Sequence, residues 1–423
     1  MALALSFSIV GFYISSMDWE WSHREWRFYH RLDFYLYWLA SISRLVIILS
    51  RLSIRFFPGS HKARSLSKSF FVNFYLVLIF FSSNHIVVFY LLFEISVIPI
   101  FLMVTGWGYQ PERVKASYAI IFYTIVSSVP LIICILLVVF LNSINQIRIL
   151  ELSINSGSLG TVLFLCIRIG FLVKLPIYGV HLWLPLAHVE APVYGSIILA
   201  GILLKLGGLG VIRLSSLLNR NCCFNGFIIV SLLGTVLVGL TCLKITDLKS
   251  VIAFSSVAHI GIVIIILMFG TKLFAWTAVF IMLTHAFSSS YIFYGSYVIY
   301  IIRGTRNILL NKGGVRVFPR FTLCWLIAVI ARIGTPPFIN LASEVYCLIL
   351  STKILGVLGL FLILIFILGS CYHLILYRSS QQEFSRWDFS SIKRDVTRLS
   401  LVVRHFHRLV LVLSLLCLVS LGY

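Results

Sequence analysis

Residues 171–192 read FLVKLPIYGVHLWLPLAHVEAP, so that a lysine stands in the middle of an apolar run and a proline follows two residues later. Proline removes one backbone hydrogen bond and leaves the carbonyl four residues earlier without its helical partner. In hydrocarbon such a carbonyl must find a partner in protein or in a water-filled cavity. If the run crosses a bilayer, the stretch therefore predicts a helix broken inside the protein, beside Lys174.

The composition indicates that the bilayer is the solvent. Of 423 residues, 60% are hydrophobic and only 11% are charged, whereas about a quarter are charged in soluble domains. Apolar runs of about 18 residues or more, each long enough to span a membrane, recur along the whole chain. The sequence predicts an all-α polytopic membrane protein with about thirteen transmembrane helices.

The net charge of +21 raises the alternative of nucleic-acid binding. The cations cluster between the apolar runs, as in 303–320, which holds five basic residues and no acidic one. Such clusters are typical of helix orientation and of contacts with anionic lipid. We therefore expect lipid contacts and no nucleic-acid partner. None of the nine cysteines forms C-x-x-C, so zinc, haem and iron–sulfur sites have no support.

Proline-interrupted runs recur at matching places in two sets of five predicted spans. The predicted spans lie near 1–16, 33–57, 69–84, 85–107, 115–142, 161–187, 192–213, 226–243, 251–269, 273–301, 321–350, 353–377 and 400–422. The fourth member of one set holds Pro176 and Pro185, and the fourth of the other holds Pro336 and Pro337. Matching interruptions in two halves point to the ion path of a transporter; two ordinary proline kinks are the alternative.

These spans divide the chain into four parts. We expect N-terminal helices over 1–68, a first five-helix repeat over 69–214, a second repeat over 226–377, and a basic segment with a C-terminal helix over 378–423.

Four ionisable side chains lie well inside the apolar runs, namely Glu94, Lys174, Lys205 and Glu344. An ionisable group at the bilayer centre costs about 2.5–3.5 kcal/mol on insertion scales. These groups must therefore pair with one another or contact water inside the helix bundle. A proton or ion relay is the default interpretation of intramembrane charges, and a static structural ion pair is the alternative.

Neighbouring groups favour proton transfer. Two opposite charges about 4 Å apart interact by about 4 kcal/mol at an effective dielectric of 20, so a small separation of Glu94 from Lys174 would change where a proton rests. Pro99 would free the carbonyl of Ile95 beside Glu94 and allow bending there.

Imidazole both accepts and donates a proton, and His181, His259 and His285 are candidate links. His181 follows Lys174 by two helical turns, on roughly the same face of a continuous helix. For each histidine, a satisfied buried side chain without a role in transport is the alternative.

The stretch 174–213, KLPIYGVHLWLPLAHVEAPVYGSIILAGILLKLGGLGVIR, resembles the family of subunit 4 of mitochondrial NADH dehydrogenase, respiratory complex I. Four further stretches agree with this family: YLLFEISVIPIFLMVTGWGYQPER, LKSVIAFSSVAHIGIV, LTHAFSSSYIF and TPPFINLASE. The matches run from about residue 85 to 350. The resemblance implies two inverted five-helix repeats, each with a broken helix.

The resemblance also implies roles for the buried groups. Glu94 would be the glutamate of the first repeat and Lys174 its broken-helix lysine. Lys205 would be the bridging lysine and Glu344 the glutamate of the second broken helix. His259 and His285 would belong to the hydrophilic axis that connects them.

Two features depart from the family pattern. Two helices, rather than three, precede the first repeat, so the N-terminal part looks shortened. Arg332 stands where a small polar residue is expected; it adds a cation near Glu344 that could hold this carboxylate charged.

By this resemblance, the chain would be a proton-translocating subunit in the membrane arm of complex I, in the mitochondrial inner membrane. It would hold no metal and no redox cofactor, because NADH, FMN, iron–sulfur clusters and ubiquinone bind to partner subunits. Its neighbours would be other membrane-arm subunits, including antiporter-like ones, accessory subunits and anionic lipid such as cardiolipin. A stand-alone or Mrp-like cation/proton antiporter is one rival, and a structural membrane subunit with static ion pairs is another.

Overall fold

The computed structural model describes residues 61–382, except residues 109, 143–158, 216–223, 271, 318, 337 and 355. Within these residues all the named secondary-structure elements are helices, and an isolated antiparallel β-bridge pairs Asp247 with Asn307. Seven of the described helices are long and apolar enough to cross a membrane. The prediction of a helical, multi-span membrane protein is thereby confirmed, while the spans predicted at 1–16, 33–57 and 400–422 lie outside the described residues.

Helices occupy each of the ten spans predicted between residues 69 and 377. The first five spans contain α3 (His61–Ser82), α4 (Ile86–Ile95), α5 (Val97–Trp107), α6 (Arg113–Asn142), α8 (Leu159–Lys174), α9 (Trp183–Glu190), α10 (Val193–Ile198), the π-helical η1 (Leu199–Leu203) and α11 (Leu204–Ser215). The next five contain α12 (Phe224–Lys244), α13 (Leu248–Met268), α14 (Lys272–Arg303), α16 (Pro319–Ile333), α17 (Ile339–Ile354) and α18 (Gly356–Tyr377). The short α15 (Gly314–Val317) precedes α16, and the π-helical η2 (Arg378–Gln382) follows α18.

Two of these spans are interrupted where the prolines stand. Helix α8 ends at Lys174 and α9 begins at Trp183, with Pro176 and the left-handed Gly179 (φ 100°) between them. Helix α16 ends at Ile333 and α17 begins at Ile339, with Gly334 (φ 78°) and Pro336 between them. The missing proline N–H groups and the reversed glycine backbones end each first half-helix inside the protein.

A smaller interruption separates α4 from α5. Ser96 alone lies between them, and its N–H donates to the carbonyl of Leu92 at 3.1 Å. Pro99 cannot donate to the carbonyl of Ile95, and Ile95 is where α4 ends. The helix is therefore interrupted for one residue beside Glu94, the place where bending was expected.

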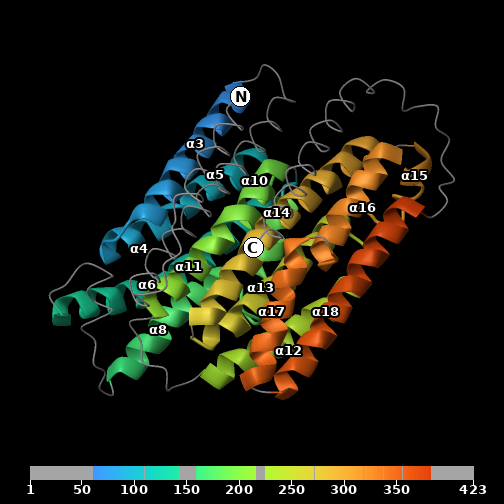
Figure 1. Ribbon diagram of the computed structural model, residues 1–423. Helices are drawn as coiled ribbons and strands as arrows, with labels where there is room; N and C mark the ends of the chain where they lie inside the picture. Colours follow the sequence, from blue (N-terminus) through green and yellow to red (C-terminus); the bar gives the residue numbers. More distant parts are fainter. Residues whose placement is uncertain are drawn as a thin grey trace, which may run out of the picture. The chain divides into compact units, whose positions relative to one another are not determined.

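Helices α13 and α14 form the centre of the described bundle. Nearly every residue of α13 is buried, and α13 packs against α9, α12 and α14. Helix α14 packs in turn against α10, α16 and α17, and α18 packs against α12 and α17, an arrangement that can be followed in Figure 1. Two of the helices that hold predicted intramembrane charges, α11 with Lys205 and α17 with Glu344, therefore pack against α14.

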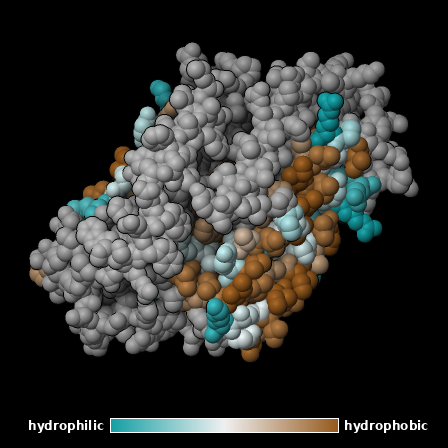
Figure 2. Space-filling view, in the orientation of Figure 1, coloured by the Kyte–Doolittle hydropathy of each residue, from teal (hydrophilic) through white to brown (hydrophobic). Residues whose placement is uncertain are grey.

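The outer helices expose apolar side chains instead. The most exposed include Phe140 of α6 and Val357 and Leu360 of α18. Figure 2 shows such side chains gathered in brown over the region where Figure 1 draws α17 and α18. Contiguous apolar surface of this size is typical of contact with lipid or with neighbouring membrane subunits.

Gly234 allows α12 to pack closely against the break between α8 and α9. A Cβ atom at Gly234 would overlap the Cβ atom of Tyr178, which lies in the break between α8 and α9. Gly226, near the start of the same helix, has no atom within 4 Å of the corresponding position.

We expect Gly234→Ala to lower the free energy of unfolding by about 1–3 kcal/mol, because the added methyl group forces the break away from α12. The measurement is the apparent melting temperature of the detergent-solubilised protein. Gly226→Ala is the matched control and should melt at or slightly above the parent temperature, since alanine favours the helix. Equal melting temperatures for the two variants would contradict this packing.

Candidate functional site

The first buried charge pair joins the ends of two interrupted helices. Nζ of Lys174, the last residue of α8, lies 3.1 Å from Oε1 of Glu94 in α4. The same Nζ donates to the carbonyl of Phe93 at 2.8 Å and lies 3.3 Å from the centroid of the Phe93 ring. The lysine is 1% exposed. An ammonium has three donors and is attracted to aromatic faces, so carboxylate, carbonyl and ring together replace its water.

The second buried lysine contacts a histidine. Nζ of Lys205 lies 3.1 Å from Nδ1 of His285 in α14 and donates to the carbonyl of Ala200 at 2.5 Å. Lys205 lies at the start of α11, directly after the π-helical turn η1, and is 1% exposed. Single π-helical turns occur frequently at functional sites.

Two further imidazoles continue from His285. The ring of His259 in α13 lies 5.9 Å from that of His285, measured between centroids, and 6.1 Å from that of His373 in α18. All three histidines are buried. The structure thus brings Lys205, His285 and His259 together, as the predicted connecting axis requires, and adds His373, which the sequence analysis did not single out.

Glu344 lies at the second helix break and is held by Asn340. Nδ2 of Asn340 donates to Oε1 of Glu344 at 2.7 Å and to the backbone carbonyl of Arg332 at 3.1 Å. A Cβ atom at Gly334 would lie 2.7 Å from Oε2 of Glu344, so only glycine lets the carboxylate approach the backbone this closely.

Arg332 is fully buried, and its guanidinium donates to Oγ of Ser288 at 3.2 Å. The charged groups of Arg332 and Glu344 do not approach within the 4 Å of an ion pair. Both residues line one small cavity of about 20 Å³ together with His259, Tyr372 and His373. A cavity of this size has room for one water molecule, and the side chain of Asn340 joins the backbone carbonyl of Arg332 to the Glu344 carboxylate.

The prediction that His181 shares a helical face with Lys174 is wrong. The helix ends at Lys174, and His181 lies in the break before α9. Its ring stacks on Tyr178 at 5.0 Å, and its Nδ1 accepts from the N–H of Gly179 at 3.3 Å. Two turns of helix cannot be counted through a segment whose backbone is reversed at Gly179, so the spacing argument failed there.

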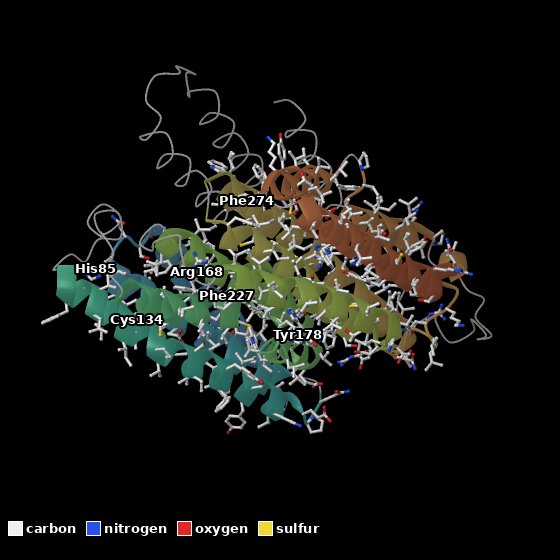
Figure 3. The ribbon with its side chains drawn as sticks, turned by 90° about the horizontal axis from the view of Figure 1, so that it is seen from below. His85, Cys134, Arg168, Tyr178, Phe227 and Phe274 are labelled. Carbon is white, nitrogen blue, oxygen red and sulfur yellow. The ribbon has the colours of Figure 1, made fainter. Side chains whose placement is uncertain are left out.

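Three further buried polar groups were not among the residues predicted from the sequence. Arg168, on α8, donates to Sδ of Met268 at 3.1 Å, and in the view of Figure 3 it lies between His85 and Tyr178 along the helices. His188, on α9, stacks on Phe293 at 4.7 Å. Lys249 donates to the carbonyls of Val189 and Ala191 at 2.9 and 2.6 Å, at the end of α9. Arg168 could have been found by the same test of a charge inside an apolar run.

Among the described residues, no group of three or more His, Cys, Asp or Glu side chains is placed to hold a metal ion. The buried groups instead form two clusters of proton donors and acceptors, one at each helix break, with lysine and histidine between them. Buried ionisable groups of this kind define a membrane protein of the ion-transporting type.

The comparisons with known proteins agree with that class. The model of the family described as NADH:quinone oxidoreductase/Mrp antiporter, transmembrane region, matches residues 83–371. NADH-ubiquinone oxidoreductase chain 4 of Locusta migratoria is 37% identical over 362 residues, 84% of this chain and 80% of that protein. The protein of the same name from Artemia franciscana is 38% identical over 332 residues, 76% of this chain and 82% of that one.

Solved structures share the fold. A chain of respiratory complex I from Thermus thermophilus has a TM-score of 0.76 at 20% identity, covering 88% of this chain and 85% of that one. A chain of the membrane-bound sulfane sulfur reductase, an archaeal respiratory membrane complex, has a TM-score of 0.73 at 18% identity, with coverage of 90% and 80%.

The chain belongs to the NADH:quinone oxidoreductase/Mrp antiporter family. Within it, the relatives that cover most of the chain are NADH-ubiquinone oxidoreductase chain 4, so the resemblance to subunit 4 is confirmed.

We expect the Glu94–Lys174 contact to contribute to the free energy of unfolding. Glu94→Leu leaves a buried ammonium without its counter-charge and should lower the free energy of unfolding by about 3–5 kcal/mol. The double change Glu94→Leu with Lys174→Met removes both charges at similar volume and should restore most of that loss. Apparent melting temperatures of the solubilised single and double variants check this, and a double variant no more stable than Glu94→Leu would contradict it.

Proposed function

We propose that this chain is a proton-translocating membrane-arm subunit of respiratory complex I, which couples NADH:ubiquinone oxidoreduction in partner subunits to proton movement. The observation that carries the proposal is the row of buried groups Lys205, His285 and His259, which reaches the cavity at the second helix break, beside the Glu94–Lys174 pair at the first break. The named relatives and the fold support it.

The relay begins at the first helix break. Glu94 and Lys174 both lie at helix ends, at 3.1 Å from each other, with Ser96 and Pro99 on one side and Pro176 on the other. A bend at either break would lengthen the contact and weaken the attraction, since the lysine is 1% exposed although Glu94 is 21% exposed. The lysine then gives up its proton more readily, because a buried ammonium without a counter-charge is costly.

The relay continues through Lys205, His285 and His259 to Glu344. The contact of Lys205 with His285 is already at hydrogen-bond distance, at 3.1 Å. The step from His259 to Glu344 crosses the small cavity that both residues line. His181, at the first helix break, is a candidate link between Lys174 and the outside of the bundle.

The architecture that fits this relay has about thirteen spans, with inverted repeats over 69–214 and 226–377, N-terminal helices over 1–68 and a C-terminal helix within 378–423. The two helix breaks, α8/α9 and α16/α17, support it because each falls in the fourth span of its set.

The redox reactions would take place in partner subunits. NADH, FMN, iron–sulfur clusters and ubiquinone would bind to partner subunits, and energy would reach this chain as conformational or electrostatic change. The partners would be other membrane-arm subunits, accessory subunits and anionic lipid such as cardiolipin, in the mitochondrial inner membrane. Exposed apolar faces on α6, α12 and α18 offer surface for such contacts.

We expect Lys174→Met to leave the complex assembled and to lower the number of protons moved per NADH oxidised, because the first exchange site is lost. The measurement is proton uptake by coupled membrane vesicles, read together with NADH oxidation. Lys244→Met, at the exposed end of α12, is the matched control and should pump as the parent. A normal pumping ratio in Lys174→Met would instead favour the structural alternative, in which the ion pair is static.

The Mrp-like antiporter alternative is tested by a native gel of gently solubilised mitochondrial membranes stained for NADH dehydrogenase activity. Peptides of this chain should migrate with a very large, NADH-oxidising band. Their migration in a smaller band without that activity would favour the antiporter, with cation-dependent transport in vesicles as its own assay.

A further inference from the structure

A fourth proton-exchanging group extends the row that begins at Lys205. His373 of α18 is 3% exposed, and its ring lies 6.1 Å from that of His259. The row therefore runs from α11 through α14 and α13 to α18, with the ring of His259 between those of His285 and His373.

The hydrogen bonds fix which nitrogen of His373 can take a proton. Its Nδ1 lies 2.8 Å from the carbonyl oxygen of Gly369. A carbonyl only accepts, so Nδ1 carries the hydrogen and Nε2 of the neutral ring is left with a lone pair. Nε2 is therefore the atom at which His373 accepts a proton.

The same reasoning orients the neighbouring ring. When Lys205 is an ammonium, Nδ1 of His285 accepts from it and Nε2 carries the hydrogen. Nε2 of His285 and Nε2 of His259 are buried and have no hydrogen-bond partner in the described part of the chain. Leaving a buried imidazole nitrogen without a hydrogen bond costs free energy. A hydrogen bond to a neighbouring ring or to a water would remove this cost.

The cavity supplies the missing bridge. At about 6 Å between ring centroids, the rings of His259 and His373 are linked most directly by a bridging water. The cavity that both line has a volume of about 20 Å³, enough for one water, and Glu344 and Tyr372 also line it. A water there can contact His259, His373 and Glu344 in turn.

Arg332 adds a constraint on charge. Its guanidinium, always charged, lines the same cavity and is buried. It opposes a second positive charge on His259 or His373 by like-charge repulsion, while Glu344 offsets it. Because of this repulsion, an imidazole beside the Arg332 guanidinium binds an added proton weakly and releases it readily.

We propose that His373 is a further proton-relay residue, which accepts a proton at Nε2 from the His259 side and releases it through the cavity to Glu344. Only a proton moves: the bond to Nε2 forms as the donor bond breaks, and the reverse occurs on release. This inference rests on the proposed function, since it lengthens the same relay.

The test uses the assembled complex in coupled membrane vesicles and compares His373→Gln with Lys174→Met. Glutamine keeps a polar group near Gly369 but cannot take a proton. We expect His373→Gln to assemble normally, to lower protons moved per NADH oxidised to the level of Lys174→Met, and to cause no further loss in the double variant. A normal ratio in His373→Gln beside a lowered ratio in Lys174→Met would overturn the inference and leave the proposed function standing. Normal ratios in both would overturn the proposed function.

If His373→Gln fails to assemble, a second variant tests the same inference. Ala258 lines the cavity, so Ala258→Val fills the space of the bridging water without touching the imidazole. Ala253, on the same helix and equally buried, does not line the cavity, and Ala253→Val is the matched control for overpacking. The inference predicts a lowered pumping ratio for Ala258→Val alone, and equal ratios in the two variants would overturn it.

Discussion

The structure depends on the need of a buried ammonium for partners. Lys174 is 1% exposed, so a carboxylate, a carbonyl and an aromatic ring take the place of water around its ammonium. All three come from Phe93 and Glu94, at the end of α4, and the lysine itself ends α8. Both helices end at or next to this contact, so the interruptions and the charge pair lie at the same place in the fold.

The same constraint organises the second half. The break between α16 and α17 leaves the carbonyl of Arg332 without a helical partner, and the side chain of Asn340 satisfies it while also holding Glu344. Gly334 turns the backbone so that the carboxylate can lie against it. Between the two breaks, α13 is buried almost throughout and most of α14 is buried, so these helices can carry the histidines away from lipid.

Much of this could be predicted from the sequence, because bilayer length and proline chemistry act locally. The ten spans between 69 and 377 and both helix breaks follow from apolar runs and from prolines. The pairing of Glu94 with Lys174 followed from the cost of isolated charge. His373 was missed because a lone histidine in an apolar helix gives no local signal, and only packing places it beside His259. His181 was misplaced because helical spacing does not apply across a break. The partner of Arg332 could not be foreseen, since it depends on how α14 meets α16.

The π-helical turn η1 ends at Leu203, two residues before Lys205. This position has a geometric consequence for the contact between Lys205 and His285. Such a turn holds one residue more than an α-helical turn. If it relaxed to α-helix, the residues on one side would rotate by about 100° about the helix axis relative to those on the other. A rotation of that size would carry the lysine amine away from the imidazole it now faces. Lys205 thus lies where a shift of one residue in the π-helical turn would move its side chain out of contact with His285.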